Sequence, residues 1–144
     1  MDRFTLILLL ATASLFVQAQ GQWYRFHTDN TGSNNSIHEN DVYEVVQDQN
    51  GLFWFATGNG IAQFDGNDWS VVSTGDGLAG EYVRCMIEDQ SGNMWFGTWG
   101  QGVSMYDGQN WTTFNSSNSG LLRDNIFKIF EDKIHPLLQG DPES

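Results

Sequence analysis

Hydrophobic and polar residues alternate along most of this chain in short runs that are separated by turn residues. Val42 to Asp48, Leu52 to Thr57, Gly60 to Asp65 and Trp69 to Ser73 are each rich in β-branched or aromatic residues. Gly, Asn and Asp lie between these runs, which is the chemistry of tight hairpin turns. The pattern therefore predicts four short antiparallel strands that pair in sequence order.

The same order of runs occurs twice, because residues 89–114 repeat the pattern of residues 48–72 about 41 positions further on. The shared residues are Asp48, Gly51, Trp54, Phe55, Thr57, Gly60, Phe64, Asp65, Gly66 and Trp69, which recur as Asp89, Gly92, Trp95, Phe96, Thr98, Gly102, Tyr106, Asp107, Gly108 and Trp111. A period in the low forties that is rich in Trp, Gly and Asp-Gly is typical of a β-propeller blade.

Most of the residues that the two copies share are expected to have a structural role in the fold. Large aromatic side chains at equivalent strand positions, such as Trp54 and Trp95, are expected to wedge neighbouring blades together. Asp48 and Asp89 each precede a glycine by three residues, and we expect them to cap the turn between the first two strands.

Partial copies flank the two complete ones. Trp23 to Phe26 matches the last strand of a blade whose earlier strands are missing, and Ile126 to Asp132 matches a first strand. Residues 27–40 are polar and predict a long loop. The sequence thus predicts an all-β fold, a partial β-propeller at residues 20–133 with blades at about 41–73 and 82–114, followed by an aberrant tail at 134–144.

A propeller closes with typically four to eight blades, so two complete blades do not close a ring. Either the chain is a fragment of a longer protein, or it closes through self-association. The repeat stops abruptly near Lys133 instead of ending in a polar capping repeat, which favours the fragment.

The N-terminus has the pattern of a secretory signal peptide. An apolar run from Phe4 to Val17 leads to Ala19, after which we expect cleavage, so residues 1–19 are interpreted as the signal peptide. The run is short for a membrane span. We therefore expect an exported protein, periplasmic or extracellular, with no membrane span in this chain.

The formal net charge of −12 argues against nucleic acid as a partner, since such binding depends on Lys and Arg. Several acidic residues lie in Asp-Gly turns, so the charge does not require a cationic ligand. Cys85 is the one cysteine, which excludes a disulfide in the monomer, and we expect it to be buried.

Catalytic and metal-binding motifs are absent from the sequence. The Asp-turns lack the Glu of an EF-hand loop, and the histidines are not at ligand spacing for zinc. The Asp and Gly of the turns are three residues apart, which differs from the Asp-box of sialidases. We expect no enzyme activity, no cofactor and no metal.

The rim loops are where a propeller usually carries its function. We expect one rim to carry residues 73–82, 99–101 and 115–125. Trp99 is the inserted residue that breaks the repeat, so it is either a ligand platform or packing over the neighbouring blade. Tyr82, Arg84 and Arg123 approach the same rim, and they complete the candidate ligand-binding set.

The second copy resembles the two-component regulator propeller repeat family. The residues that carry this resemblance are Val83, Met86, Ile87, Asp89, Gly92, Trp95, Phe96, Gly97, Thr98, Gly102, Val103, Tyr106, Asp107 and Gly108. The lead-in from Gly120 to Ile126 is also similar, with Leu122 in place of the usual proline, and Ala56 stands where the family prefers Gly. The resemblance implies a β-propeller from the periplasmic sensory part of a hybrid histidine kinase, or from a secreted protein without a kinase.

Three functions remain open at this stage. The leading hypothesis is a non-catalytic, exported ligand-binding or sensing module that takes an oligosaccharide or another small extracellular ligand. The alternatives are a secreted structural or adhesive protein, and the propeller region of an extracellular polysaccharide-active enzyme. Further blades of the same protein, or a second copy, are the other expected partners.

Overall fold

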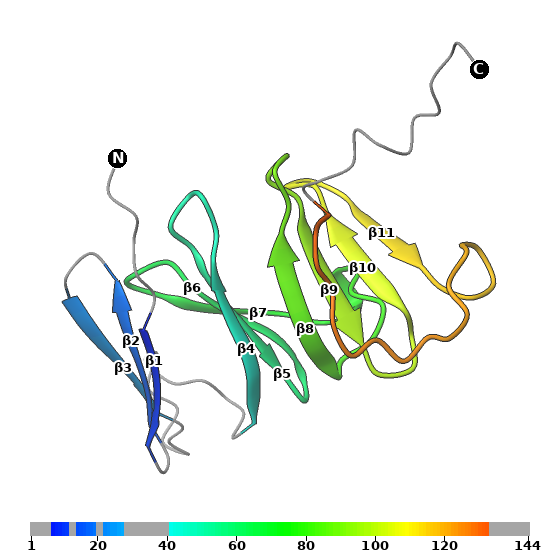
Figure 1. Ribbon diagram of the computed structural model, residues 1–144. Coiled ribbons are helices and arrows are strands. Elements are labelled where there is room, and N and C mark those ends of the chain that lie inside the picture. Colours follow the sequence, from blue (N-terminus) through cyan, green and yellow to red (C-terminus); the bar gives the residue numbers. More distant parts are fainter. Residues whose placement is uncertain (1–6, 12–13, 20–21, 28–40, 133–144) are drawn as a thin grey trace, which may run out of the picture.

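The computed structural model describes residues 7–11, 14–19, 22–27 and 41–132. They form three antiparallel sheets that lie side by side in sequence order, as Figure 1 shows. Within these residues there is no α-helix, and the one helical element is the short 3-10 turn η1, Thr74–Asp76. The predicted all-β fold with two four-stranded blades is confirmed.

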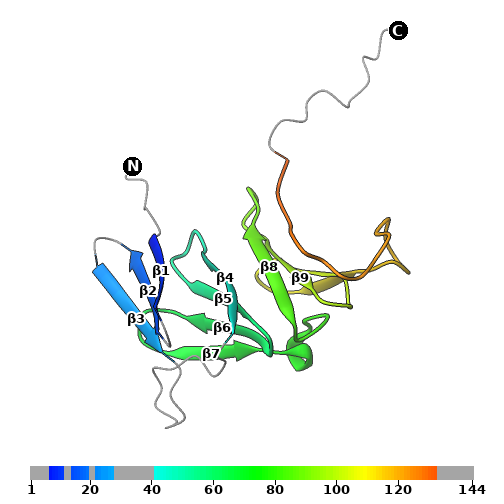
Figure 2. The ribbon, with the colours of Figure 1, turned by 60° about the horizontal axis from the view of Figure 1, so that its bottom comes forward.

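Blade 1 consists of β4 (Val42–Gln47), β5 (Phe53–Thr57), β6 (Gly60–Phe64) and β7 (Trp69–Val72). Blade 2 consists of β8 (Val83–Glu88), β9 (Met94–Thr98), β10 (Val103–Tyr106) and β11 (Trp111–Phe114). In each blade the strands pair with their sequence neighbours, so the sheet order is the chain order. The first strands β4 and β8 lie next to each other, as Figure 2 shows from a second side.

The Asp-turns form as predicted, and they do so identically in both blades. Asp48 accepts hydrogen bonds from two backbone N–H groups of its turn and from the indole Nε1 of Trp54 at 2.9 Å. Asp89 makes the same set of bonds, with the Trp95 indole at 2.8 Å. The turn glycines Gly51 and Gly92 have φ of 89° and 83°, which glycine adopts without strain. One aspartate thus ties each turn to the strand that follows.

The main core lies between the two blades. Trp54 of β5 is 3% exposed and packs against the rings of Phe96 and Tyr106, with centroid separations of 5.5 and 6.3 Å. The other buried members of this core are Ala56, Ile61, Leu78, Val83, Met86 and Met94. A second, smaller cluster lies on the other face of blade 1 and contains Val45, Phe53, Phe55, Ala62 and Phe64. The prediction that the repeated aromatics wedge the blades together is therefore confirmed for Trp54.

The N-terminal sheet differs from the expectation. β3 (Gln22–His27) contains the predicted last strand of a blade, but the earlier strands are not missing, because β1 (Ile7–Ala11) and β2 (Ser14–Ala19) precede it in the sheet. The apolar run is long enough to form a hairpin, and pairing satisfies its backbone groups. The signal peptide at residues 1–19 stays a prediction, since pairing in the uncleaved chain does not test cleavage. The predicted loop at 27–40 and the tail at 134–144 lie almost wholly outside the described residues.

The predicted first strand at Ile126 to Asp132 is wrong as a strand. Among the described residues this segment belongs to no ladder, and the isolated bridge between Trp99 and Asn125 lies directly before it. The physical reason is that a first strand pairs with the second strand of its own blade, and no such strand is described here. Figure 2 shows the segment (orange) running back beside blade 2.

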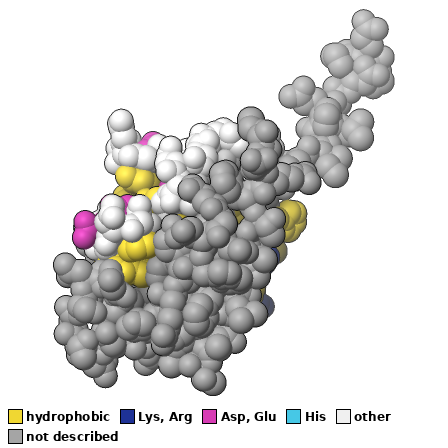
Figure 3. All heavy atoms as spheres, turned by 90° about the vertical axis from the view of Figure 1, so that its left-hand side faces the viewer, with side chains coloured by type: hydrophobic (Ala, Val, Ile, Leu, Met, Phe, Trp, Pro, Cys, Tyr) yellow, Lys and Arg dark blue, Asp and Glu magenta, His cyan; other side chains and the backbone are white. Residues whose placement is uncertain are grey.

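In the described part of the face in Figure 3, hydrophobic side chains lie in separate places, with a few acidic side chains beside them. No helix among the described residues is long and apolar enough to cross a membrane.

Candidate ligand-binding site

The first strands of both blades carry a β-bulge at the same place. In β4 the register shifts between Val42 and Glu44, and in β8 between Val83 and Cys85. Tyr43 and Arg84 are therefore the bulged residues of the two strands. A bulge takes a residue out of the ladder and re-aims its side chain. The repeat thus places one re-aimed side chain per blade at the rim.

Tyr43 and Arg84 meet the rim residues Tyr82 and Trp99. The rings of Tyr43 and Tyr82 lie 5.2 Å apart, and their hydroxyls hydrogen-bond to each other. The Arg84 guanidinium carbon lies 5.1 Å from the centroid of the Tyr43 ring and 5.7 Å from that of Trp99. The rings of Trp99 and Phe127 pack in a T-shaped arrangement, with their centroids 5.1 Å apart. We call these residues the rim cluster: Tyr43, Tyr82, Arg84, Trp99 and Phe127.

The inserted loop that carries Trp99 is fixed by backbone hydrogen bonds. The Trp99 N–H donates to the carbonyl of Tyr82 at 2.9 Å. The N–H groups of Gly100 and Gly102 both donate to the carbonyl of Asp124, at 3.1 and 2.9 Å. Trp99 is nevertheless 47% exposed, Tyr82 is 39% exposed and Phe127 is 65% exposed. The loop is held in place while its aromatic faces remain open to solvent.

The structure brings together three of the four predicted site residues. Trp99, Tyr82 and Arg84 are all members of the rim cluster. Arg123 is exposed and lies in the loop before Asn125, and the ring and cation–ring contacts of the cluster in the described chain do not involve it. Tyr43 and Phe127 were missed by the sequence reasoning. Alignment of the repeats could have identified them, because Tyr43 and Phe127 occupy the same repeat position as Arg84.

The contact between the two tyrosines changes the acidity of one of them. The hydrogen bond from Tyr82, with smaller effects of partial burial and of the nearby Asp41, raises the pKa of Tyr43 to about 12. The positive charge of Arg84 acts in the opposite direction. The Tyr43 phenol is therefore neutral at physiological pH, and Arg84 supplies the positive charge of the rim cluster.

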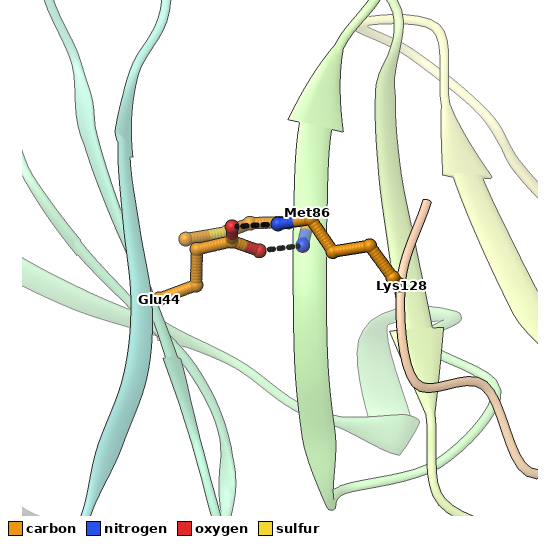
Figure 4. Close-up of polar contacts among 3 residues, drawn as sticks. All are labelled: Glu44, Met86 and Lys128. Atoms are coloured by element: carbon orange, nitrogen blue, oxygen red, sulfur yellow. Dashed lines mark hydrogen bonds and ion pairs between the residues drawn. The ribbon is translucent and has the colours of Figure 1, made fainter. Parts of the chain in front are cut away.

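A second polar group lies further along the two first strands and links them, as Figure 4 shows. The Glu44 carboxylate accepts a hydrogen bond from the Met86 N–H at 2.6 Å and pairs with the Lys128 ammonium at 2.8 Å. The bond with Glu44 raises the pKa of Lys128. Glu44 is thus neutralised by its own partner and does not compensate the charge of Arg84.

Cys85 lies beside this group and is 2% exposed, which confirms that the thiol is buried. Burial, together with the charge of Glu44, raises the pKa of the Cys85 thiol, although backbone N–H groups of Gly97 and Ile129 act against that increase. A neutral buried thiol is a poor nucleophile. Within the described ranges, no group of three His, Cys, Asp or Glu side chains could hold a metal ion.

The comparisons with known proteins bear on the repeat. The family model described as "Two component regulator propeller" matches residues 77–100, which begin directly after η1 and contain β8, β9 and Trp99. Residues 77–100 carry a two-component regulator propeller repeat. The resemblance drawn from the sequence is thereby confirmed.

The repeat also has a counterpart among solved structures. The chain is similar to the extracellular domain assigned to the hybrid two-component system BT3049 from B. thetaiotaomicron, with a TM-score of 0.56 and 22% sequence identity. The match covers 77% of this chain and 17% of that domain, so this chain spans about a sixth of its length. At this identity the match shows the fold. No curated protein matches the chain in sequence.

The rim cluster combines two kinds of contact. Exposed indole and phenol rings can stack on the apolar face of a sugar ring or on another flat ligand. A guanidinium held between two aromatic rings keeps its N–H edges free to bond a carboxylate or a sulfate with two parallel hydrogen bonds. The arrangement is therefore suited to the recognition of a flat ligand that carries an acidic group.

Proposed function

We propose that this chain is a non-catalytic, exported ligand-binding module of a sensor propeller, and that the rim cluster is its binding site. The observation that carries the proposal is that side chains from three segments, β4, the start of β8 and the inserted loop, converge on one exposed surface, namely Tyr43, Tyr82, Arg84 and Trp99. The two-component regulator propeller repeat supports the sensor role, because the solved counterpart is an extracellular domain of such a system.

The ligand we propose is an oligosaccharide with an acidic group. Arg84 forms no ion pair with a carboxylate in the part of the chain that the structure describes, although the chain carries a net charge of −12. Its planar group is instead fixed between Tyr43 and Trp99. Holding a cation in position before binding reduces the entropy lost when the ligand arrives. A carboxylate or sulfate on a sugar would fill the open edge of Arg84 while the sugar ring stacks on Trp99.

The long-range charge of the protein opposes an anionic ligand, but only weakly at the site. Charges further away than about 8 Å are largely screened at physiological ionic strength. Near the rim, Glu44 is paired with Lys128, so the local charge is set mainly by Arg84 and Asp41. We therefore expect binding to persist at physiological salt. We also expect tighter binding of a ligand whose acidic group accepts two parallel hydrogen bonds from Arg84.

The test compares neutral oligosaccharides with uronic-acid or sulfated ones of the same length and linkage, by calorimetric titration against the full chain. We expect the acidic ligand to bind more tightly, and Trp99→Ala to weaken both ligands about tenfold, which corresponds to about 1.4 kcal/mol. Arg84→Gln should remove the preference for the acidic ligand, and Arg84→Lys should restore only part of it, because an ammonium lacks the planar fork.

Arg123→Gln is the matched control, since Arg123 is exposed and outside the cluster. It removes the same charge and should leave both affinities unchanged. Binding that responds to Arg123→Gln as much as to Arg84→Gln would contradict the assignment, because the effect would then come from net charge alone. Binding that is indifferent to Trp99→Ala would contradict it as well.

A further inference from the structure

The loops that follow the second strands, β5 and β9, differ at one position of the rim. In both loops a threonine hydroxyl, that of Thr57 or Thr98, donates to the carbonyl of a later glycine, at 2.9 and 2.8 Å. The residue directly after this threonine is Gly58 in blade 1 and Trp99 in blade 2. One loop thus presents a large aromatic side chain at this position, and the other presents none.

The backbone of blade 1 does not require a glycine at position 58. The φ of Gly58 lies outside the left-handed region, and an added Cβ would lie 3.8 Å from the Tyr82 ring and 3.9 Å from the Tyr43 hydroxyl, which are ordinary contact distances. Gly60 in the same loop differs, because its φ is 93° and an added Cβ would lie 2.5 Å from the Val72 carbonyl oxygen. The turn therefore explains Gly60. The missing side chain of Gly58 instead leaves the adjacent tyrosines without a cover from this loop.

These two tyrosines, which we call the tyrosine pair, have hydrogen-bonding capacity to spare. A tyrosine hydroxyl donates one hydrogen bond and can accept others, and the bond between Tyr43 and Tyr82 uses one of the two protons. In the described chain neither hydroxyl makes another hydrogen bond. Tyr82 is also 39% exposed, so part of its ring can contact a ligand. A donor, acceptors and a partly open ring therefore lie together beside Gly58.

Arg84 lies between the tyrosine pair and Trp99. Its guanidinium carbon is 5.1 Å from the centroid of the Tyr43 ring and 5.7 Å from that of Trp99. A sugar that stacks on Trp99 and gives its acidic group to Arg84 would thus have the tyrosine pair on the far side of Arg84. The negative charge of Asp41 acts on Tyr43, so a second acidic group would be repelled there. The hydroxyl groups of a neutral sugar, which both donate and accept, fit this place better.

We propose that the tyrosine pair is a second subsite of the rim cluster, which binds a neutral sugar next to the acidic sugar at Arg84 and Trp99. This inference rests on the proposed function, because it assigns a place to the next sugar of the same ligand. Gly58 determines the specificity of the subsite by leaving room for that sugar. The rim cluster then recognises an oligosaccharide by an acidic sugar and its neutral neighbour together.

The test titrates two ligands against the full chain by calorimetry. One is glucuronate, and the other is a trisaccharide that carries glucuronate between two glucose residues, so that a neutral sugar is present on either side of the acidic one. We expect the trisaccharide to bind about tenfold more tightly, because it adds hydrogen bonds to the tyrosine pair and a contact with the Tyr82 ring. Equal affinities for the two ligands would overturn the proposal.

Two variants test the residues of the subsite. Gly58→Leu would cover the tyrosine pair, and Tyr82→Phe removes one hydroxyl while it keeps the ring. Each should lower the affinity for the trisaccharide by about three- to tenfold and leave the affinity for glucuronate unchanged. Gly58→Ala is the matched control, because its one methyl group makes only ordinary contacts and should change neither affinity. Tyr82→Phe keeps the test decisive even where Gly58→Leu does not fold.

The outcomes separate this inference from the proposed function. A loss confined to the trisaccharide in Gly58→Leu or Tyr82→Phe supports the second subsite. If Trp99→Ala weakens both ligands while those two variants change neither, the acidic sugar binds at the rim cluster and the second subsite is wrong. An equal loss for both ligands would also overturn it, since the tyrosine pair would then act only by positioning Arg84. Binding of neither ligand to the unaltered chain would contradict the proposed function, and the second subsite with it.

Discussion

Trp54 and Trp95 occupy the same position in two blades and yet have different surroundings. Each indole donates to the aspartate of its own turn, at 2.9 and 2.8 Å. Trp54 is 3% exposed because blade 2 covers it, whereas Trp95 is partly exposed beside an apolar cavity. The comparison shows that the repeat determines the internal geometry of a blade. The packing of the next blade determines how much burial stabilises that blade.

Truncating the two tryptophans should have the largest effect and should separate them. We expect Trp54→Ala to lower the free energy of unfolding by about 3–5 kcal/mol, since it empties the core between the blades. Trp95→Ala should cost about 1–2 kcal/mol, because part of that ring is already in water. Urea unfolding followed by circular dichroism measures both. Equal costs would mean that the blades are equivalent in energy, despite their different neighbours.

Gly97→Ala should have the next largest effect, because the added Cβ would lie 2.5 Å from the Cys85 sulfur and 2.6 Å from Ile126. Overpacking of this kind costs about 1–3 kcal/mol. Adding Ile126→Val should recover part of the loss, since the double substitution reproduces the pair Ala56 and Val83, which lies in the core between blades 1 and 2. A double-mutant cycle on the free energy of unfolding measures the coupling. Additive effects would show that Ile126 does not pack on Gly97.

The titration of Tyr43, a member of the rim cluster, should give the smallest effect on the free energy of unfolding. Its pKa is raised to about 12 mainly by the hydrogen bond with Tyr82, so the folded chain holds this proton at a pH where the unfolded chain releases it. The resulting stability is complete below the ordinary pKa of about 10 and is lost as the pH rises towards 12. Tyr82→Phe should lower the Tyr43 pKa towards 10.

Absorbance of the phenolate against pH measures this change, with Tyr106→Phe as the control. Tyr106 is a tyrosine of blade 2 whose hydroxyl bonds to the Gly108 carbonyl, away from the rim. An unchanged high-pH titration in Tyr82→Phe would show that the two hydroxyls are not coupled. It would also remove one support for a preformed rim cluster.

The sequence was a good guide wherever one residue type is required by local geometry. The Asp-turns, the strand order and the two blades followed from the repeated residues, because hydrogen bonds within a turn and pairing between neighbouring strands need no distant partner. The sequence also pointed to Trp99 as the residue that the repeat does not require. It did not point to Tyr43 and Phe127, although they share the repeat position of Arg84, because the order of residues does not show that this position is bulged in β4 and β8.

Where the sequence reasoning was wrong, a neighbour was the reason. Residues 126–132 have the composition of a strand, but a strand needs a ladder, and their only bridge in the described chain is the one beside them at Asn125. We expected no strands of this sheet before β3, because residues 1–19 were interpreted as a signal peptide. The structure has β1 and β2 there, and both belong to the same sheet as β3. Composition does not say which segments will pair.

The amino-acid sequence by itself determined the repeat, the turns and the alternation that makes each blade a sheet, since these depend on contacts over a few residues. The tertiary structure decided which of two equivalent tryptophans is buried, and which rim side chains surround Arg84. Both depend on segments more than 35 positions apart, such as Tyr43 with Tyr82 and Glu44 with Lys128, and their contact is set by how one blade packs on the next.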